Sequence, residues 1–129
     1  MDMALKTARV ALVGIGTLAN SVFIERGSLD PSMVRELGRA GAVGEICGRF
    51  FDARGRECAT GWRHRVISVE LAQLRRTPLT VAVVSGADRT AAIEAAIHGG
   101  LIKGLVIDDG GAEALLAAGT APGKAGRQA

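Results

Sequence analysis

The chain has 129 residues, which is the size of a single domain. Hydrophobic residues make up 48% and charged residues 22%, a balance that is typical of a folded protein and excludes a disordered polyelectrolyte. The formal net charge is +3, and no apolar run approaches the roughly 18 to 20 residues that a membrane span needs. Because the start of the chain has no signal-peptide pattern, we expect a cytoplasmic protein with no membrane contact.

Few residues have the chemistry of a catalytic or metal site. Cys47 and Cys58 have no neighbouring Cys or His pair, so the sequence predicts buried free thiols and no zinc site or redox pair. His64 and His98 have no obvious nucleophile beside them, and the motifs of common hydrolases are absent from the sequence. The four aromatic residues offer little surface for stacking bases, which disfavours single-stranded nucleic acid as a partner. We therefore expect a protein that is not an enzyme and that uses no metal and no cofactor.

The first third of the chain is predicted to form one strand and one helix. Residues 8–13 are an apolar run closed by Gly14-Ile15-Gly16, which indicates a buried strand followed by a tight turn. Residues 20–25 are predicted to be an extended or irregular connection. A helix then opens at Asp30-Pro31, because the aspartate can cap free N–H groups and proline fits the first helical position.

The middle third is predicted to contain two strands and a short helix. Residues 43–51 are apolar enough for one strand, in which Gly44 and Gly48 indicate bulges or the close approach of another backbone. Residues 66–69 are predicted to be a brief strand and residues 70–76 a brief helix that a following proline ends.

The last third has the clearest pattern. Apolar runs at 79–84 and 104–108 predict two strands, and helices are expected at 88–98, with Asp88 as N-cap, and at 112–118. Strands that alternate with helices predict an α/β fold, in which a parallel sheet has flanking helices.

Ligands of open parallel sheets bind beyond the carboxyl ends of the strands, so the loops there hold the candidate site residues. Gly14 and Gly16 follow the first predicted strand and belong to a G-x-G-x-x-A stretch at 14–19. That stretch leaves a dinucleotide-binding turn open as an alternative, although the helix and acidic strand end that such a site requires do not follow it. A plain tight turn is favoured.

The loop after the strand at 79–84 has the chemistry of an anion site. Gly86 supplies a turn with exposed N–H groups, and Arg89 adds a cation at a predicted helix N-terminus, where a phosphate is favoured. The alternative is that Arg89 only pairs with a carboxylate such as Asp109, and the spacing favours neither interpretation. Asp108, at the end of the last predicted strand, is expected to contact ligand hydroxyls or to cap a helix.

Five blocks of the sequence together resemble the effector-binding domain of the SorC family of bacterial sugar-sensing transcription regulators. The first three are Val-Gly-Ile-Gly at 13–16, Gly-Ala-Val-Gly-Glu-Ile-Cys-Gly-Arg-Phe-Phe-Asp at 41–52 and Arg-Val-Ile-Ser-Val-Glu-Leu at 65–71. Residues 85–93 and 106–109 are similar to that family's Gly-x-x-Lys-x-x-Ala-Ile segment and Thr-Asp-Glu strand end. Within the family the chain is also similar to the erythritol-operon repressor type.

The resemblance implies a Rossmann-like (NagB/RpiA-like) fold related to that of sugar-phosphate isomerases, without catalysis. In this family a phosphorylated sugar or polyol effector alters the geometry of a homo-oligomer and hence its binding to DNA. The match covers the C-terminal half of the effector domain, so we expect a partial sugar-binding domain at 1–118 and a flexible tail at 119–129. The family's helix-turn-helix domain is absent from the sequence, and the chain by itself is not expected to bind operator DNA.

The resemblance also implies ligand contacts. Glu45 matches an acidic residue that contacts ligand hydroxyls, Arg89 stands at the position of a ligand-binding Lys, and Arg26 matches a further basic contact. The planar fork of Arg89 differs from a compact ammonium, and Ile107 stands where Thr is usual, which removes a hydroxyl. Two other functions stay open, a dinucleotide-binding fragment of an oxidoreductase and a structural or oligomerising remnant.

Overall fold

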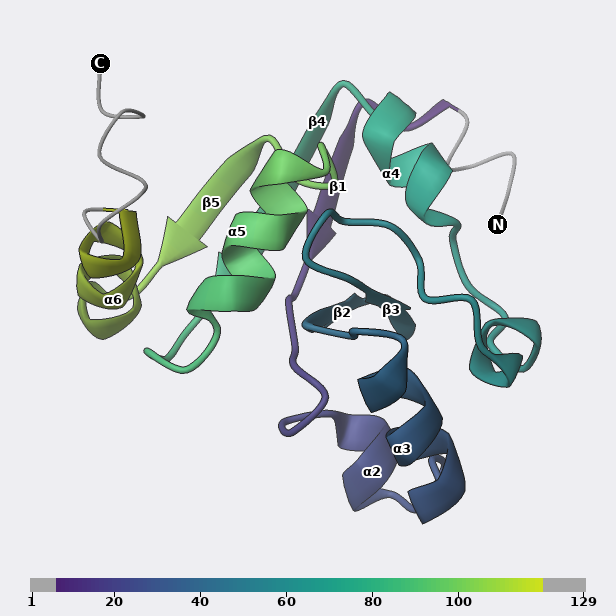
Figure 1. Cartoon of the computed structure of the whole chain (residues 1–129). Helices are drawn as coiled ribbons and strands as arrows, with labels where there is room; N and C mark the ends of the chain where they lie inside the picture. Colours follow the sequence, from purple (N-terminus) through teal and green to yellow (C-terminus); the bar gives the residue numbers. More distant parts are fainter. Residues whose placement is uncertain (1–6, 120–129) are drawn as a thin grey trace.

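The computed structural model describes residues 7–119, which form a three-stranded parallel sheet and a two-stranded hairpin with helices packed around them (Figure 1). No helix among these residues is long and apolar enough to cross a membrane. All but the first residue of the predicted tail at 119–129 lies outside the described residues. In chain order the elements are β1 (Val10–Val13), α2 (Val22–Glu25), α3 (Pro31–Arg39), β2 (Gly44–Ile46), β3 (Arg49–Phe51), the 3-10 helix η1 (Gly61–His64), α4 (Leu71–Arg76), β4 (Leu79–Val84), α5 (Thr90–His98), β5 (Gly104–Ile107) and α6 (Asp109–Gly119).

The parallel sheet has the strand order β1-β4-β5 and confirms the predicted α/β fold. Strand β4 lies in the centre, where it pairs in parallel with both neighbours. Its side chains alternate, because successive residues of a strand point to opposite faces. Thr80, Ala82 and Val84 are buried, whereas Leu79 and Val83 are exposed.

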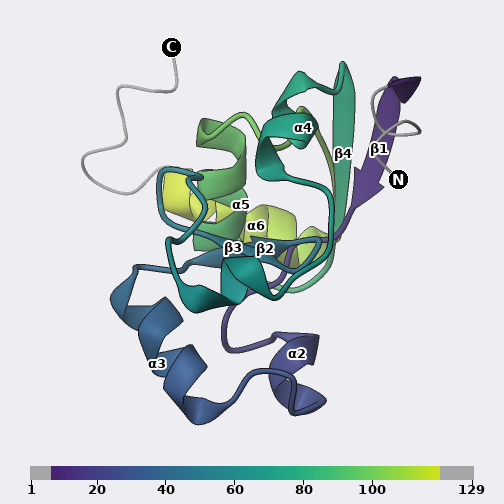
Figure 2. The same ribbon diagram turned by 90° about the vertical axis from the view of Figure 1, so that its right-hand side faces the viewer.

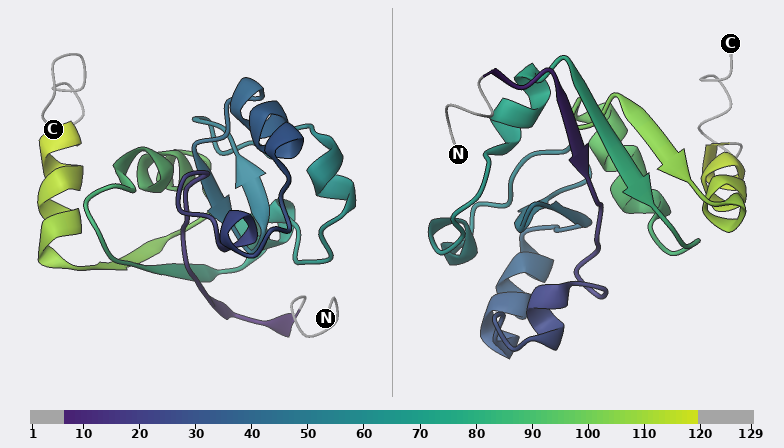
Figure 3. Two further views of the ribbon diagram at one scale, coloured as in Figure 1. Left: turned by 90° about the horizontal axis from the view of Figure 1, so that it is seen from below. Right: turned by 180° about the vertical axis from the view of Figure 1, so that it is seen from behind.

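Helix α5 and the hairpin cover one face of this sheet (Figures 1 and 3). Ala92, Ala95 and Ala96 of α5 are buried, and these small side chains allow a close approach of the helix. The predicted helix at 88–98 is confirmed for its residues from Thr90 onward. The main core contains these residues together with Val13, Ile15, Ile46, Phe51, Leu71, Leu74, Ala82, Val84, Ile93, Leu101 and Ile102.

The prediction of one strand at 43–51 is wrong, because this segment is an antiparallel hairpin of β2 and β3. Cys47 and Gly48 form its turn with left-handed φ values of 55° and 81°, so Gly48 belongs to a turn and not to a bulge. At Gly44 the close approach is made by side chains and not by the predicted backbone. A Cβ there would lie 2.6 Å from Cζ of Phe51 and 2.7 Å from Cβ of Ala92.

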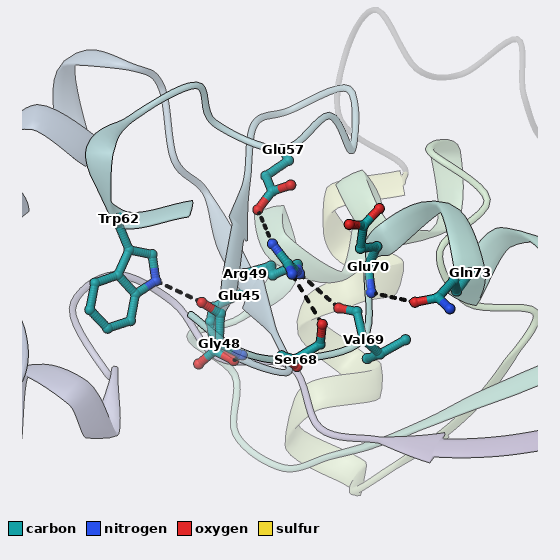
Figure 4. A network of polar contacts seen from close by, with 9 residues as sticks. All are labelled: Glu45, Gly48, Arg49, Glu57, Trp62, Ser68, Val69, Glu70 and Gln73. Atoms are coloured by element: carbon teal, nitrogen blue, oxygen red, sulfur yellow. Dashed lines mark hydrogen bonds and ion pairs between the residues drawn. The ribbon is translucent and has the colours of Figure 1, made fainter. Parts of the chain in front are cut away.

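The predicted strand at 66–69 is also wrong, since these residues form no ladder. The buried Arg49 side chain satisfies two of their carbonyl groups (Figure 4). Its Nε donates to the carbonyl oxygen of Val69 at 2.7 Å and its Nη2 to that of Ser68 at 3.0 Å. A side chain from β3 thus replaces the partner strand that these carbonyls would otherwise need.

The helix starts depend on side-chain caps. The Asp30 cap is confirmed, because the Met33 N–H donates to Asp30 Oδ1 at 2.8 Å. Helix α4 has a capping box between Glu70 and Gln73.

The irregular connection predicted at 20–25 is wrong, because Val22–Glu25 form the short helix α2.

A second apolar cluster lies on the other side of the hairpin, against α2, α3 and η1 (Figure 2). Trp62 is buried there, its Nε1–H donates to the Gly48 carbonyl oxygen at 2.7 Å, and Phe23 meets its ring edge to face at 5.3 Å.

Cys58 is a buried free thiol as predicted, but Cys47 is exposed in the hairpin turn. Burial, with the nearby carboxylates of residues 52 and 57, raises the pKa of the Cys58 thiol to about 11.

Candidate functional site

The carboxyl ends of the three parallel strands bring three loops to one edge of the sheet. The loop after β1 contains Gly14 and Gly16, the loop after β4 contains Gly86 and Arg89, and Asp108 follows β5. Because β4 pairs with both other strands, its loop lies between the other two. Five of the seven predicted site residues therefore lie at this edge, as the topology of a parallel sheet requires.

Arg89 reaches across from the β4 loop to the β1 loop. Its Nη1 donates to the Ile15 carbonyl oxygen at 2.9 Å, and its Nε lies 3.8 Å from Oδ1 of Asp88. The Nε atom is buried and makes no hydrogen bond to the described residues, although the side chain is 29% exposed. A guanidinium has five N–H donors, and the Ile15 carbonyl takes only one of those of Arg89. The alternative that Arg89 pairs with a nearby carboxylate is borne out by Asp88, whereas Asp109 is in none of the ion pairs described among residues 7–119.

Glu45 meets the same loop from the hairpin. Its backbone N–H and C=O each form a 2.9 Å hydrogen bond with Gly16, which makes an isolated antiparallel bridge. Its carboxylate Oε2 accepts from the Gly48 N–H at 2.9 Å, and Oε1 lies 3.1 Å from where a Cβ on Gly16 would stand. Glu45 and Arg89 therefore contact consecutive residues of one loop, Gly16 and Ile15.

The carboxylate of Asp108 occupies the amide groups of the β4 loop. Both of its oxygens accept from the Gly86 N–H at 3.2 Å, and Oδ1 also accepts from the Gly111 N–H at 2.9 Å. Asp108 thus caps α6, which explains why this helix begins at Asp109 and not at the predicted residue 112. The sequence predicts that the Gly86 N–H faces a ligand anion, but this N–H is already bound to the carboxylate of Asp108.

Asp88 has another role than the predicted one. Residue 89 and not Asp88 is the N-cap of α5. Asp88 Oδ2 instead accepts from Asn20 Nδ2 at 2.6 Å, a contact that links the first and second loops. Asn20 was missed in the sequence, because no local pattern connects two residues 68 positions apart.

Arg26 makes no contact with the predicted site residues at the carboxyl edge of the sheet. It is exposed just after α2, and within residues 7–119 it has no hydrogen bond or ion pair with another predicted site residue. Gly14 is exposed, and a Cβ there would meet no atom within 4 Å. Packing therefore does not require glycine at position 14, whereas at Gly16 it favours one.

The geometry does not favour a dinucleotide site at 14–19. The Gly16 N–H donates to Glu45, and the next helix begins only at Val22, so no helix N-terminus faces the turn. Residues 7–119 contain no group of three or more His, Cys, Asp or Glu that could hold a metal. A hollow of about 540 Å³ lies at the amino end of the sheet, and its lining includes Arg9, Arg76 and Pro78 but none of the predicted site residues.

Known proteins support the resemblance found in the sequence. The family model described as "Putative sugar-binding domain" matches residues 2–117. The erythritol catabolism regulatory protein EryD of Brucella abortus is 36% identical over 112 residues, which cover 84% of this chain and 34% of EryD. The finding agrees with the similarity to the erythritol-operon repressor type.

Two solved structures have the same fold. The sugar-binding domain of a transcriptional repressor from Vibrio fischeri superposes with a TM-score of 0.80 at 32% identity, over 93% of this chain and 50% of that one. The full-length sorbitol operon regulator SorC from Klebsiella pneumoniae gives a TM-score of 0.78 at 29% identity, over 89% of this chain and 38% of SorC. The chain spans about a third of the length of the curated relatives it matches. It belongs to the sugar-binding domain family of SorC-type transcription regulators.

Proposed function

We propose that this chain binds a phosphorylated sugar or polyol as the effector-sensing part of a SorC-type regulator. One observation carries the proposal. Arg89 and Glu45, which lie far apart in the sequence, contact consecutive residues of the β1 loop at the carboxyl edge of the sheet. A cation with unused donors and a residue with a half-buried carboxylate thus both contact the β1 loop.

The two side chains suit the two ends of such a ligand. The planar guanidinium of Arg89 can donate two parallel hydrogen bonds to a phosphate, and the Glu45 carboxylate can accept from sugar hydroxyls. The Asp108 carboxylate would repel a phosphate from the Gly86 amide, because it already binds there. Phosphate is therefore expected beside Arg89 and the hydroxyls beside Glu45 and Asp108.

The same proposal covers the whole regulator. The effector shifts the geometry of a homo-oligomer in the cytoplasm, and the whole regulator binds DNA through a helix-turn-helix domain. The chain catalyses no reaction. EryD and SorC carry the names of two polyols, erythritol and sorbitol, and the deoxyribonucleoside regulator of Bacillus subtilis carries that of a sugar derivative, so these names support a sugar-like or polyol-like effector class.

Thermal shift with matched pairs of ligands tests the assignment. Erythritol phosphate and sorbitol phosphate are compared with their unphosphorylated parents, and Trp62 fluorescence gives an independent titration. A ligand at a hundred times its Kd stabilises by about 2.7 kcal/mol, which is several degrees in Tm for a domain of this size. At least one phosphorylated compound is expected to raise the Tm by several degrees more than its unphosphorylated parent does.

Variants separate the two contacts. Arg89→Gln should abolish the difference between each phosphate and its parent, and Arg89→Lys should restore part of it. Glu45→Gln should weaken both members of each pair equally, since both carry the hydroxyls. Arg39→Gln, at the exposed end of α3, is the matched control. A phosphate preference that survives Arg89→Gln, or stabilisation by NAD(P) and by no sugar or polyol phosphate, would contradict the proposal.

A further inference from the structure

Asp88 and Arg89 are neighbours in the chain and carry opposite charges, but they form only an open ion pair. The Arg89 Nε atom lies 3.8 Å from Asp88 Oδ1, which is too long for a hydrogen bond. The same Nε atom is buried and makes no hydrogen bond to any of residues 7–119. A donor that is shielded from water therefore has no acceptor, although a carboxylate lies beside it.

The β1 loop holds the two charged side chains apart. The Ile15 carbonyl oxygen accepts from Arg89 Nη1 at 2.9 Å. Asn20 Nδ2 donates to Asp88 Oδ2 at 2.6 Å. Asn20 is itself fixed, because its backbone N–H donates to Thr17 Oγ1 at 3.1 Å. Each member of the ion pair is thus bound to a different residue of the same loop.

Little else restrains the Asp88 carboxylate. Its side chain is 63% exposed, and within the described part of the chain Asn20 is its only hydrogen-bond donor. A Cβ on Gly86 would lie 2.9 Å from Asp88 Oδ1, so the carboxylate packs on the main chain of that residue. A shift of about 1 Å would bring Oδ1 within hydrogen-bond distance of Arg89 Nε. The Asn20 hydrogen bond is therefore the contact that keeps the ion pair open.

A closed ion pair would compete with an anionic ligand. A carboxylate that accepts from Nε occupies one of the donors that a phosphate needs for paired hydrogen bonds, and its charge repels the phosphate. In the open pair this donor stays unused, and its desolvation is uncompensated until an acceptor binds. The open arrangement therefore favours an anion beside Arg89.

We propose that Asn20 is a positioning residue of the candidate site, which holds Asp88 away from Arg89 and so sets the affinity for the phosphate group of the effector. This inference rests on the proposed function, because it takes Arg89 to be the phosphate-binding group. Asp88 is then an internal competitor of the ligand, and the hydrogen bond from Asn20 weakens that competition.

Two single variants with opposite effects test the proposal. Asn20→Ala frees Asp88 to close onto Arg89, so the Kd for a sugar phosphate should rise about two- to fivefold, the range of an exposed ion pair. Asp88→Asn removes the competing charge and keeps an oxygen that can accept from Asn20, so the Kd should fall by a similar factor. In the double variant the Asn20 substitution should have no further effect. If the contact only joined the two loops, both single variants would weaken binding, and that outcome would overturn the proposal.

Isothermal titration calorimetry measures these constants with erythritol phosphate, sorbitol phosphate and inorganic phosphate. Asp109→Asn is the matched control, since Asp109 also lies at the carboxyl edge of the sheet but is in no ion pair among residues 7–119. It should change the Kd by a smaller factor than Asp88→Asn does. An equal factor would mean that net charge alone accounts for the effect, which would also overturn the proposal.

A second measurement needs no ligand. In a nitrogen–proton correlation NMR spectrum, the Nε–H resonance of Arg89 is identified by its absence in Arg89→Gln. Asn20→Ala should move this resonance downfield and slow its exchange with water, because Asp88 becomes its acceptor, and the added Asp88→Asn should reverse both changes. An unchanged resonance in Asn20→Ala would refute the positioning role. A resonance that moves while no phosphate compound binds would support that role and contradict the proposed function.

Discussion

Arg49 is expected to contribute more to stability than any surface ion pair of the chain. Its side chain is 9% exposed, its Nη1 contacts Glu57 Oε2 at 3.0 Å, and its other donors bind the carbonyl oxygens of residues 68 and 69. Arg49→Met would leave two carbonyls and one carboxylate without their partner. Removal of one member of a buried pair costs about 3–5 kcal/mol, which for this domain is a fall in Tm of roughly 12 °C or more.

Glu57→Gln is the matched control for this prediction. Glu57 is 24% exposed, and an amide keeps an acceptor for Arg49, so the expected cost is about 1 kcal/mol. Urea unfolding followed by fluorescence measures both values, because Trp62 is the single tryptophan and lies beside the Gly48 turn. A cost for Arg49→Met no larger than that for Glu57→Gln would refute the view that Arg49 holds residues 66–69 in place of a partner strand.

Three further predictions concern local structure. Gly44→Ala should destabilise the fold by about 1–3 kcal/mol, since its Cβ would overlap Phe51 and Ala92. Gly110→Ala is the control, because a Cβ there would meet no atom within 4 Å and should not destabilise the fold. Equal urea midpoints for the two variants would contradict this prediction. Asp30→Ala should cost about 1 kcal/mol through the lost cap of α3, and a circular-dichroism melt identical to wild type would count against it. The Cys58 thiol has a folded pKa of about 11 against 9.0 for an ordinary thiol, so its contribution is complete below pH 9 and lost as the pH rises toward 11. The stability difference between wild type and Cys58→Ala should therefore shrink over this range, and a pH-independent difference would disprove the burial argument.

Local patterns predicted the elements that depend on local physics. The run at 79–84 is a strand because its apolar residues alternate between a buried and an exposed face, and the Asp30 cap needs only a side chain three residues from its partner. The hairpin was missed because its turn carries a cysteine with positive φ, which is rare outside glycine and asparagine. The false strand at 66–69 has β-branched residues but no partner, and only the fold shows that Arg49 takes that place.

The candidate site was predictable by residue type but not by contact. The resemblance alone points to Glu45, whereas the strand-end rule already points to Gly16, Gly86, Arg89 and Asp108. Their arrangement depends on pairs such as Arg89 with Ile15, 74 positions apart, which no sequence period encodes. Asp88 was taken for an N-cap because the cap signal is local, whereas its actual partner Asn20 comes from another loop.

The hairpin is the layer that joins the candidate site to the rest of the fold (Figures 2 and 4). Ile46 and Phe51 point into the main core and Phe50 into the second cluster, so both faces of the hairpin are buried. Its turn at Gly48 donates its N–H to the Glu45 carboxylate and accepts the Trp62 indole N–H through its carbonyl. A ligand hydroxyl that donates to the Glu45 carboxylate therefore competes with the Gly48 N–H for this acceptor. The carbonyl group of the same residue, Gly48, accepts the hydrogen bond of the Trp62 indole. Trp62 is expected to report effector binding by this route without touching the effector, and Glu45→Gln should remove the spectral change while Arg39→Gln keeps it.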